Sequence, residues 1–343
     1  MTSVADPLAL YKAARASGAS WAGFYNRNVR LDTPSGPVVV RIPIPGADAM
    51  DLRVWPEHLV LQGIAGHVGR RRLPRLLHVS EAPAFQIYEF VPGEQVDAVA
   101  PRGVGVPEVV VRDVVALFAE LLAVPRDALP PSPPGWPEDG DTAAFARRLS
   151  DVTEHVHATF LGRYAGLFAQ LGIPDAPLAE VTARWEDLHP RPFRLAHCDV
   201  HRKNMLLDRT HVVFLDWELA LWADPVYDLA VHVHKMEYQP AEQAAVTGAW
   251  QRVAPAACSA GWEPDVGIYL AHERVKSAVV DTVRYTTLIA SGRLTPDQER
   301  ARIHRLAVKL EAAGGVWGWR HRVADGEVEA AVRRWASRAR APG

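Results

Sequence analysis

The sequence has few cysteines and no long apolar run. Only two cysteines, Cys198 and Cys258, occur in 343 residues, which excludes a disulfide scaffold and fits a reducing compartment. No run approaches the roughly 18 apolar residues of a transmembrane helix. The amino-terminal stretch also lacks the apolar core and small-residue cleavage site of a secretion signal. We therefore expect a cytoplasmic protein with no membrane partner.

An excess of charge of either sign is also missing. Lys and Arg number 38 and Asp and Glu number 40, so the net charge is −2. Because no global field attracts nucleic acid, we expect no nucleic-acid partner. The densest basic run, Arg70, Arg71, Arg72 and Arg75, has no interleaved aromatic residues and is typical of a solvated loop. The composition, with 48% hydrophobic and 23% charged residues, is that of a globular protein long enough for two lobes.

The first ninety or so residues predict strands with one helix among them. Segments 23–33 and 37–44 are rich in β-forming residues and are separated by a Pro-Ser-Gly turn, which predicts a hairpin. A helix is expected within 51–69, where apolar residues recur at helical spacing. Two more strands are expected around a turn at Pro83. We place the end of this amino-terminal lobe, residues 1–93, at the Pro-Gly pair that follows.

The remaining residues, 94–343, predict a mainly helical lobe. Apolar side chains keep one helical face in 110–121 and another in 145–160. The proline-rich segment 124–141 between them is expected to be an irregular surface loop or lid. A later helix should begin at Thr295, because "TPDQ" has an N-cap, a first-turn proline and a capping-box glutamine.

The motif "HCDVHRKNMLL" is followed by a second short apolar strand, and the pair predicts a hairpin over 205–214. A hairpin places the residues before its first strand next to those after its second. Asp199 and Asn204 should therefore lie near Asp216 and Glu218. Three carboxylates repel one another unless a positive group lies between them, and such oxygen ligands suit magnesium.

Phosphoryl transfer needs this combination of groups. The protein mostly positions the reactants and neutralises charge, with one carboxylate on the attacking hydroxyl and others on the metal. In this interpretation Asp199 orients or accepts the hydroxyl proton, while Asn204 and Asp216 bind Mg²⁺. The spacing of His197, Asp199 and Asn204 matches that of a kinase catalytic loop, and "DWE" takes the place of the metal-binding Asp-Phe-Gly.

The histidines of this motif leave a second interpretation open. His197, Asp199 and His201 alternate like zinc ligands of a hydrolase, but a further ligand with suitable spacing is missing nearby. We expect His197 to hydrogen-bond to backbone and shape the loop, and His201 to line the mouth of the acceptor site. Cys198, in a segment expected to be extended, is predicted to be a buried small residue and not a nucleophile.

The segments "HCDVHRKNMLL", "VVFLDWELALWADPVYDLA" and "FQIYEFVPGE" resemble the aminoglycoside phosphotransferase and choline kinase superfamily of small-molecule kinases. The resemblance extends from about residue 20 to about residue 290 and is strongest in 195–230. It implies an α+β, protein-kinase-like, two-lobed fold, with a small antiparallel β lobe, a larger mainly helical lobe and ATP (or GTP) between them. By position, Asp199 matches the catalytic base, Asn204 and Asp216 match Mg²⁺ ligands, and Asp228 matches a residue that braces the catalytic loop.

The resemblance also implies the nucleotide-binding residues. Arg41 stands where the superfamily usually has a phosphate-holding lysine, and Glu57 is its expected partner on the helix. A guanidinium also binds phosphate, although it is longer and forked. The phosphate loop departs from the glycine-rich pattern of protein kinases because it has one glycine. The other expected nucleotide contacts are Gly23 and Asn26 in this loop, and Glu89 to Val91 in the hinge.

The acceptor site is the least explicit part of the sequence. Glu273 and Asp281 are eight residues apart in a predicted helix and so share a face. Their carboxylates are candidates for binding an amino group of the substrate. The alternative is that they pair with Arg274 and Arg284 along the same helix.

These observations predict an enzyme that phosphorylates a hydroxyl of a small molecule, most readily an aminoglycoside-like antibiotic or an amino sugar. A metabolic kinase for a choline-like, sugar or nucleoside metabolite is the alternative. An inactive nucleotide-binding regulator is a further alternative, against which the complete set of Asp199, Asn204 and Asp216 argues. A protein substrate is disfavoured, since six residues, Leu219 to Asp224, leave little room for a peptide-docking segment. The sequence leaves the oligomeric state open.

Overall fold

The computed structural model places most of the chain in two compact units, here called unit 1 and unit 2. The described residues are 6–19, 21–22, 26–45, 50, 52–319 and 323–340. Unit 1 consists of residues 1–49, 53–136 and 192–259. Unit 2 consists of residues 50–52, 137–191 and 260–343. The predicted division of the chain after residue 93 lies inside unit 1 and stays a prediction.

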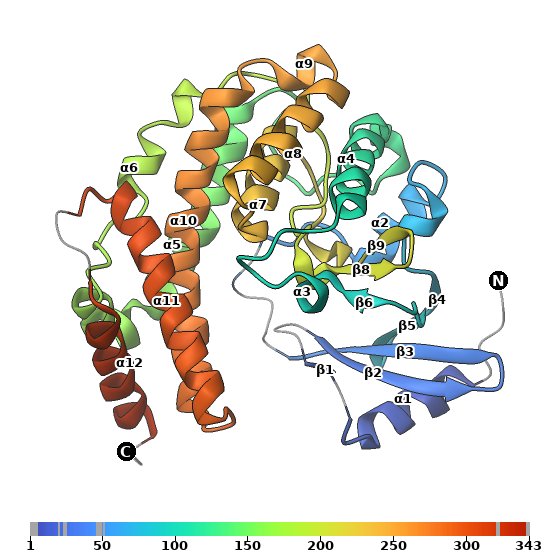
Figure 1. Cartoon of the computed structure of the whole chain (residues 1–343), viewed down its shortest axis with the longest axis horizontal. Helices are drawn as coiled ribbons and strands as arrows, with labels where there is room; N and C mark the ends of the chain where they lie inside the picture. Colours follow the sequence, from blue (N-terminus) through green and yellow to red (C-terminus); the bar gives the residue numbers. More distant parts are fainter. Residues whose placement is uncertain are drawn as a thin grey trace. The chain divides into compact units, whose positions relative to one another are not determined.

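Unit 1 contains the predicted small antiparallel sheet (Figure 1). Its five strands have the order β1-β2-β3-β5-β4. They are β1 (Trp21–Ala22), β2 (Asn26–Thr33), β3 (Gly36–Pro43), β4 (Leu76–Glu81) and β5 (Ala84–Glu89). The predicted hairpin is confirmed, because β2 pairs with β3 along its whole length from Asn26 to Thr33. The two strands predicted around Pro83 are β4 and β5.

Alternation of side chains along the strands builds the core of this sheet. Val38 and Val40 on β3 are buried, whereas Val39 between them is partly exposed. The buried face is covered by α1 (Pro7–Ala16), whose Ala14 is buried. The apolar core between them consists of Ala14, Val29, Val38, Val40, Phe85 and Ile87.

The other helices of unit 1 include the two that apolar periodicity predicted, within 51–69 and over 110–121. The α-helices are α2 (Glu57–Ile64), α3 (Val96–Val99), α4 (Glu108–Ala123), α7 (Pro225–Met236), α8 (Pro240–Val253) and α9 (Ala256–Ser259). The short 3₁₀ turns are η1 (Arg70–Arg72), η2 (Arg126–Ala128), η4 (Arg202–Asn204) and η5 (Trp217–Leu219). Arg70 and Arg71 of the basic run are exposed, and Arg72 pairs with Glu120 at 2.6 Å. Segment 124–141 is irregular apart from η2, as predicted.

Two small sheets surround the "HCDVHRKN" loop. One pairs β7 (Arg194–Ala196) with β10 (Leu221–Ala223). The other has the order β6-β8-β9 and consists of β6 (Glu94–Gln95), β8 (Met205–Asp208) and β9 (His211–Phe214). Met205 lies opposite Phe214, and the Leu215 N–H donates to the carbonyl of Asn204 at 2.8 Å. The two ends of the hairpin therefore meet, as the sequence predicted.

Helix α7 is almost wholly buried and is bonded to the same loop. Asp224 caps its first turn by accepting from the Val226 N–H at 2.9 Å. His232 Nδ1 donates to the carbonyl of Val200 at 2.8 Å, so Nε2 accepts from the hydroxyl of Tyr238 at 2.9 Å. The neutral ring satisfies both contacts, and burial lowers the pKa of His232 to about 4.

Unit 2 is helical. It consists of α5 (Thr142–Gln170), α6 (Ala179–Thr182), η3 (Trp185–Asp187), α10 (Trp262–Ala290), α11 (Pro296–Val316) and α12 (Asp325–Arg340). Helix α10 packs against α5, α11 and α12 (Figure 1). The predicted start of α11 is confirmed, since Thr295 and Gln298 form a reciprocal capping box. No helix in the described part of the chain is both long and apolar enough to cross a membrane.

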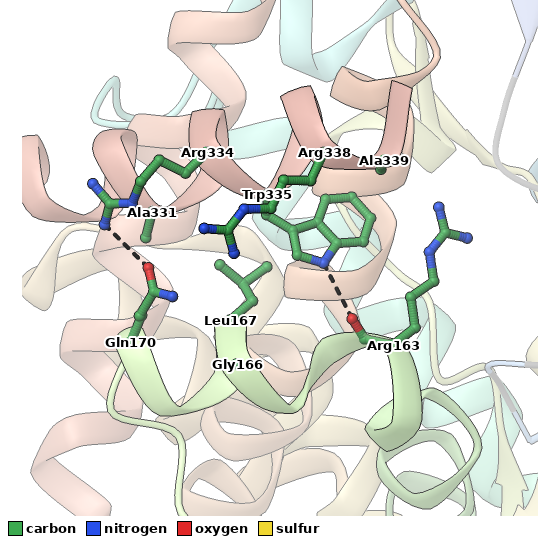
Figure 2. Close-up of a pocket in the computed structure, with 9 residues that line it drawn as sticks. All are labelled: Arg163, Gly166, Leu167, Gln170, Ala331, Arg334, Trp335, Arg338 and Ala339. Carbon is green, nitrogen blue, oxygen red and sulfur yellow. Dashed lines mark hydrogen bonds between the residues drawn. The ribbon is translucent and has the colours of Figure 1, made fainter. Parts of the chain in front are cut away.

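A cavity of about 290 Å³ lies between α5 and α12 (Figure 2). Trp335 crosses it, and its indole N–H donates to the carbonyl of Arg163 at 3.3 Å. Arg334 donates to the side-chain oxygen of Gln170 at 3.0 Å. All residues that line this cavity belong to unit 2, whereas the "HCDVHRKN" loop belongs to unit 1.

The environment of His232 predicts an acid-sensitive fold. Its pKa of about 4 lies below the value of about 6.5 in an unfolded chain, so the unfolded state binds more protons between these pH values. The stability that the neutral ring contributes is thus complete above about pH 6.5 and is lost as the pH falls toward 4. We expect His232→Gln to make the free energy of unfolding less dependent on pH in this window. Urea unfolding at several pH values checks this, and His155→Gln, at an exposed position, is the control. An unchanged pH slope would contradict the prediction.

Candidate active site

The loop between β7 and β8 is held by Asp228 of α7. Its carboxylate accepts the backbone N–H of His197 at 3.0 Å and that of Cys198 at 2.8 Å. The contact expected for Asp228 is thus present, and burial raises the pKa of this carboxyl to about 6. Cys198 is buried as expected, but its φ of 59° is left-handed. The expectation of an extended backbone at this residue is therefore wrong.

Asp199 is the one carboxylate of the loop, residues 197–204, and it has three neighbours. Lys235 Nζ lies 2.5 Å from Oδ1, and the amide nitrogen of Asn204 donates to Oδ2 at 2.7 Å. His201 Nε2 is 3.5 Å from Oδ1. Burial alone would raise the pKa of Asp199, but Lys235 and then His201 outweigh it and lower the pKa. Asp199 is therefore an ionised carboxylate fixed from two sides.

The two histidines of the motif differ in their contacts. Both ring nitrogens of His197 are buried without a hydrogen-bond partner, and the ring lies 4.3 Å from that of Trp217. The backbone N–H of His197 makes the polar contact with Asp228, and the expected hydrogen bond from the side chain to backbone stays a prediction. Burial lowers the pKa of His197 to about 4. His201 caps η4 by accepting a hydrogen bond from the Lys203 N–H at 3.2 Å. Its expected place at the mouth of the substrate site stays a prediction.

Arg41 of β3 lies among three carboxylates. It is 3.4 Å from Glu57, and its Nη2 is 2.5 Å from Asp216 and 2.8 Å from Glu218. Burial would lower the pKa of Arg41, but the carboxylates, Asp216 first, outweigh it and raise the pKa. The sequence predicted a positive group among Asp199, Asp216 and Glu218. Arg41 contacts two of these, Asp216 and Glu218, whereas Asp199 pairs with Lys235. A magnesium ion at this place stays a prediction.

Glu57 connects the start of α2 to the segment after β9. Besides its ion pair with Arg41, it accepts from the backbone N–H of Trp217 at 2.9 Å and from the hydroxyl of Tyr88 at 2.8 Å. The contact between Arg41 and Glu57 expected from the resemblance is present. Its role in nucleotide binding stays a prediction.

Glu218 accepts hydrogen bonds from side chains on two further segments of the chain. Arg53 Nη2 and the amide nitrogen of Asn26 each lie 3.0 Å from its carboxylate, in addition to Arg41. Burial, followed by the charge of Asp216, raises the pKa of Glu218 to about 7. Asn26, expected to contact the nucleotide, therefore binds Glu218 in this structure.

The oxygen atoms near the end of the β8–β9 hairpin fit a hard cation such as magnesium. Asp216 has a left-handed backbone (φ 66°), and its side chain is 27% exposed. Asn204 uses its amide nitrogen for Asp199, which leaves its amide oxygen as a possible ligand. Among the described residues no group of three or more His, Cys, Asp or Glu is arranged to hold a metal. Asp216 and Glu218 instead meet at Arg41.

The expected hinge, residues 89–91, begins at the last residue of β5. Glu89 is exposed, pairs with Arg75 at 3.2 Å, and donates its N–H to the carbonyl of the same arginine at 2.9 Å. Val91 is partly buried. Gly23, the expected phosphate-loop glycine, lies outside the described residues.

The two carboxylates proposed for acceptor binding lie on α10 in unit 2, and both are buried. Glu273 is 3.2 Å from His272 and 3.4 Å from Lys276. Asp281 is 2.7 Å from Lys309 of α11, which with Arg284 outweighs burial and lowers the pKa of Asp281. The alternative from the sequence was that both carboxylates form ion pairs along the helix. The structure has ion pairs, with Arg284 as expected but with Lys276 and Lys309 in place of Arg274. The role of the two carboxylates in acceptor binding stays a prediction.

Sequence reasoning missed two cations of the site, Arg53 and Lys235. Arg53 stands alone before α2, and no local pattern marks it. Lys235 does have a signal, because Asp228, His232 and Lys235 follow the i, i+4, i+7 spacing of one helix face. Glu218 was expected near Asp199 and Asp216 from the hairpin geometry, but no sequence feature indicated its role.

Comparisons with known proteins agree with this geometry. The model of the family described as "Phosphotransferase enzyme family" (APH) matches residues 19–264. No curated protein matches the chain. A choline/ethanolamine kinase family protein from Mesorhizobium loti has a similar structure, with a TM-score of 0.54 at 17% identity over 96% of each chain. The aminoglycoside phosphotransferase APH(4)-Ia gives 0.55 at 16% identity, over 95% of this chain and 97% of that one.

Choline kinase LicA from Streptococcus pneumoniae is a third similar structure, with a TM-score of 0.53 at 11% identity over 88% of this chain and 98% of that one. At such identities the likeness shows the fold alone. The α+β, protein-kinase-like fold class is thus confirmed. The match of the family model confirms the predicted superfamily. Since the family model covers well over half of the 343 residues, the chain belongs to the phosphotransferase enzyme family.

Proposed function

We propose that the protein transfers the terminal phosphoryl group of ATP (or GTP) to a hydroxyl of a small molecule. The observation that carries this proposal is the ionised Asp199, which Lys235 and Asn204 hold in place. The same unit contains Arg41 with its three carboxylate partners. Phosphoryl transfer requires a carboxylate on the attacking hydroxyl and positive groups near the phosphates. Membership of the phosphotransferase family supports the same reaction.

In the proposed reaction Asp199 accepts the proton of the acceptor hydroxyl while the hydroxyl oxygen bonds to the γ-phosphorus. The bond between the γ-phosphorus and the β–γ bridging oxygen breaks, and ADP leaves with its electron pair. Asp199 then releases the proton to solvent. We assign Arg41 to the donor phosphates, with Glu57 holding it. Asp216 and Asn204 would hold magnesium, which supplies further neutralisation of phosphate charge.

For the acceptor we propose an aminoglycoside-like antibiotic or an amino sugar. A thermostable variant of APH(4)-Ia, with a TM-score of 0.54 and 16% identity, was solved as a ternary complex with AMP-PNP and hygromycin B. The choline kinases with the same fold support the second class, a choline-like, sugar or nucleoside metabolite. His201, Glu273 and Asp281 remain our candidates for acceptor contacts.

Purified protein is expected to consume ATP in the presence of magnesium only when a suitable acceptor from these classes is added. Asp199→Asn should lower kcat by a factor of about 100 to 10,000, because the general base is lost, while the affinity for ATP is kept. Coupled ADP release across an acceptor panel, with mass spectrometry of the product, checks both. Asp208→Asn, at the far end of strand β8, is the matched control. Wild-type protein that phosphorylates no acceptor, or an equally active Asp199→Asn variant, would sink the proposal.

Asp216→Ala should weaken binding of ATP with magnesium far more than binding of adenosine. The carboxylate is proposed to reach the nucleotide through the metal, so adenosine, which has no phosphates, does not use it. Calorimetry with each ligand in the wild-type protein, Asp216→Ala and the control Asp208→Ala measures the difference. An equal loss of affinity for both ligands would contradict the prediction. Asp216 would then act on the structure through Arg41 and not through the metal.

A further inference from the structure

Lys235, near the end of α7, contacts the catalytic loop at two points. Its Nζ lies 2.5 Å from Oδ1 of Asp199 and donates to the carbonyl of Cys198 at 3.2 Å. One ammonium group therefore holds both the carboxylate of Asp199 and the peptide group that precedes it. The carbonyl in this contact belongs to Cys198, whose φ of 59° turns the loop.

Each oxygen of Asp199 has its own donor. Lys235 binds Oδ1, while the amide of Asn204 binds Oδ2 at 2.7 Å. Two donors on opposite oxygens fix the rotation of the carboxylate about its Cβ–Cγ bond. A carboxylate oxygen accepts more than one hydrogen bond, so each keeps acceptor capacity for a substrate hydroxyl.

The cation comes from α7 and not from the loop itself. Arg202 lies three residues after Asp199, but its buried guanidinium donates to the carbonyls of Met236, Ala100 and Val104. Its bond to Met236 fastens the end of α7 to the loop next to Lys235. His232 adds a second link, to Val200, and Asp228 accepts two backbone N–H groups of the loop. The position of the ammonium relative to Asp199 is thus set by four hydrogen bonds between the helix and the loop.

We propose that Lys235 is a positioning residue that orients the carboxylate of Asp199 toward the acceptor hydroxyl. This inference rests on the proposed function. A neighbouring ammonium makes a carboxylate a weaker proton acceptor, so the benefit of the contact lies in geometry. Reacting groups that are held in place contribute to rate through orientation, and small misplacements reduce it.

The test is a double-mutant cycle with Asp199. Single-turnover phosphoryl transfer is measured for wild type, Lys235→Met, Asp199→Asn and the double variant, on an acceptor that the wild type phosphorylates. We expect Lys235→Met to lower kcat about 10- to 100-fold and to change the KM for ATP less than twofold, an effect on the transition state alone. In the Asp199→Asn background the same substitution should change the rate less than twofold, because Lys235 acts through Asp199.

Two further variants complete the experiment. Lys12→Met, on the exposed face of α1, is the matched control and should keep wild-type rates. Lys235→Arg keeps the charge and should recover a substantial part of the lost kcat. If Lys235→Met fails to fold, Lys235→Arg takes its place in the cycle, and its rate deficit must likewise vanish in the Asp199→Asn background.

The outcomes separate this inference from the function on which it rests. A wild-type protein that transfers phosphate to no acceptor overturns both. A wild-type protein that does transfer phosphate, with a Lys235→Met variant that keeps its kcat, overturns the positioning role alone. The same holds if the effects of Lys235→Met and Asp199→Asn multiply, since Lys235 would then act independently of the carboxylate.

Discussion

The contact of Arg41 with three carboxylates is the constraint on which unit 1 depends. Glu57, Asp216 and Glu218 come from α2 and from the segment after β9, and the guanidinium comes from β3. Removing an ion from water costs several kcal/mol unless it is paired. A single cation thus contacts three partly or wholly buried anions. Removing it would take an ion pair from each of them, although Glu218 would keep its pair with Arg53. The sheet, α2 and the hairpin end are consequently bound to one electrostatic centre.

Local elements of the fold were predictable because their signals are local. The hairpin of β2 and β3, the strands around Pro83 and the capping box at Thr295 each follow from residues within a few positions of one another. The meeting of Asn204 with Leu215 followed from hairpin geometry. The contact of Arg41 with Glu57, by contrast, was expected only from the family resemblance.

The partners of the buried charges were not predictable in the same way. Arg53 and Glu218 are 165 positions apart in the sequence, and periodicity says nothing about such pairs. The sequence predicted a positive group among Asp199, Asp216 and Glu218, with magnesium as the interpretation, but it did not indicate the protein cations at this place. In the structure Arg41 contacts Asp216 and Glu218, and Lys235 contacts Asp199. His197 shows the same limit, because its alternation with Asp199 and His201 gave no hint that its ring is buried against Trp217. Pairs far apart in sequence depend on the packed fold.

Helix α7 presents Asp228, His232 and Lys235 to the "HCDVHRKN" loop on consecutive turns. Adjacent residues of an α-helix are rotated by about 100° around its axis. Deleting or inserting one residue before Asp228 within α7 would therefore turn all three contacts away together. The number of residues in α7 before Asp228 is therefore a requirement of the loop geometry, separate from the identity of any one side chain.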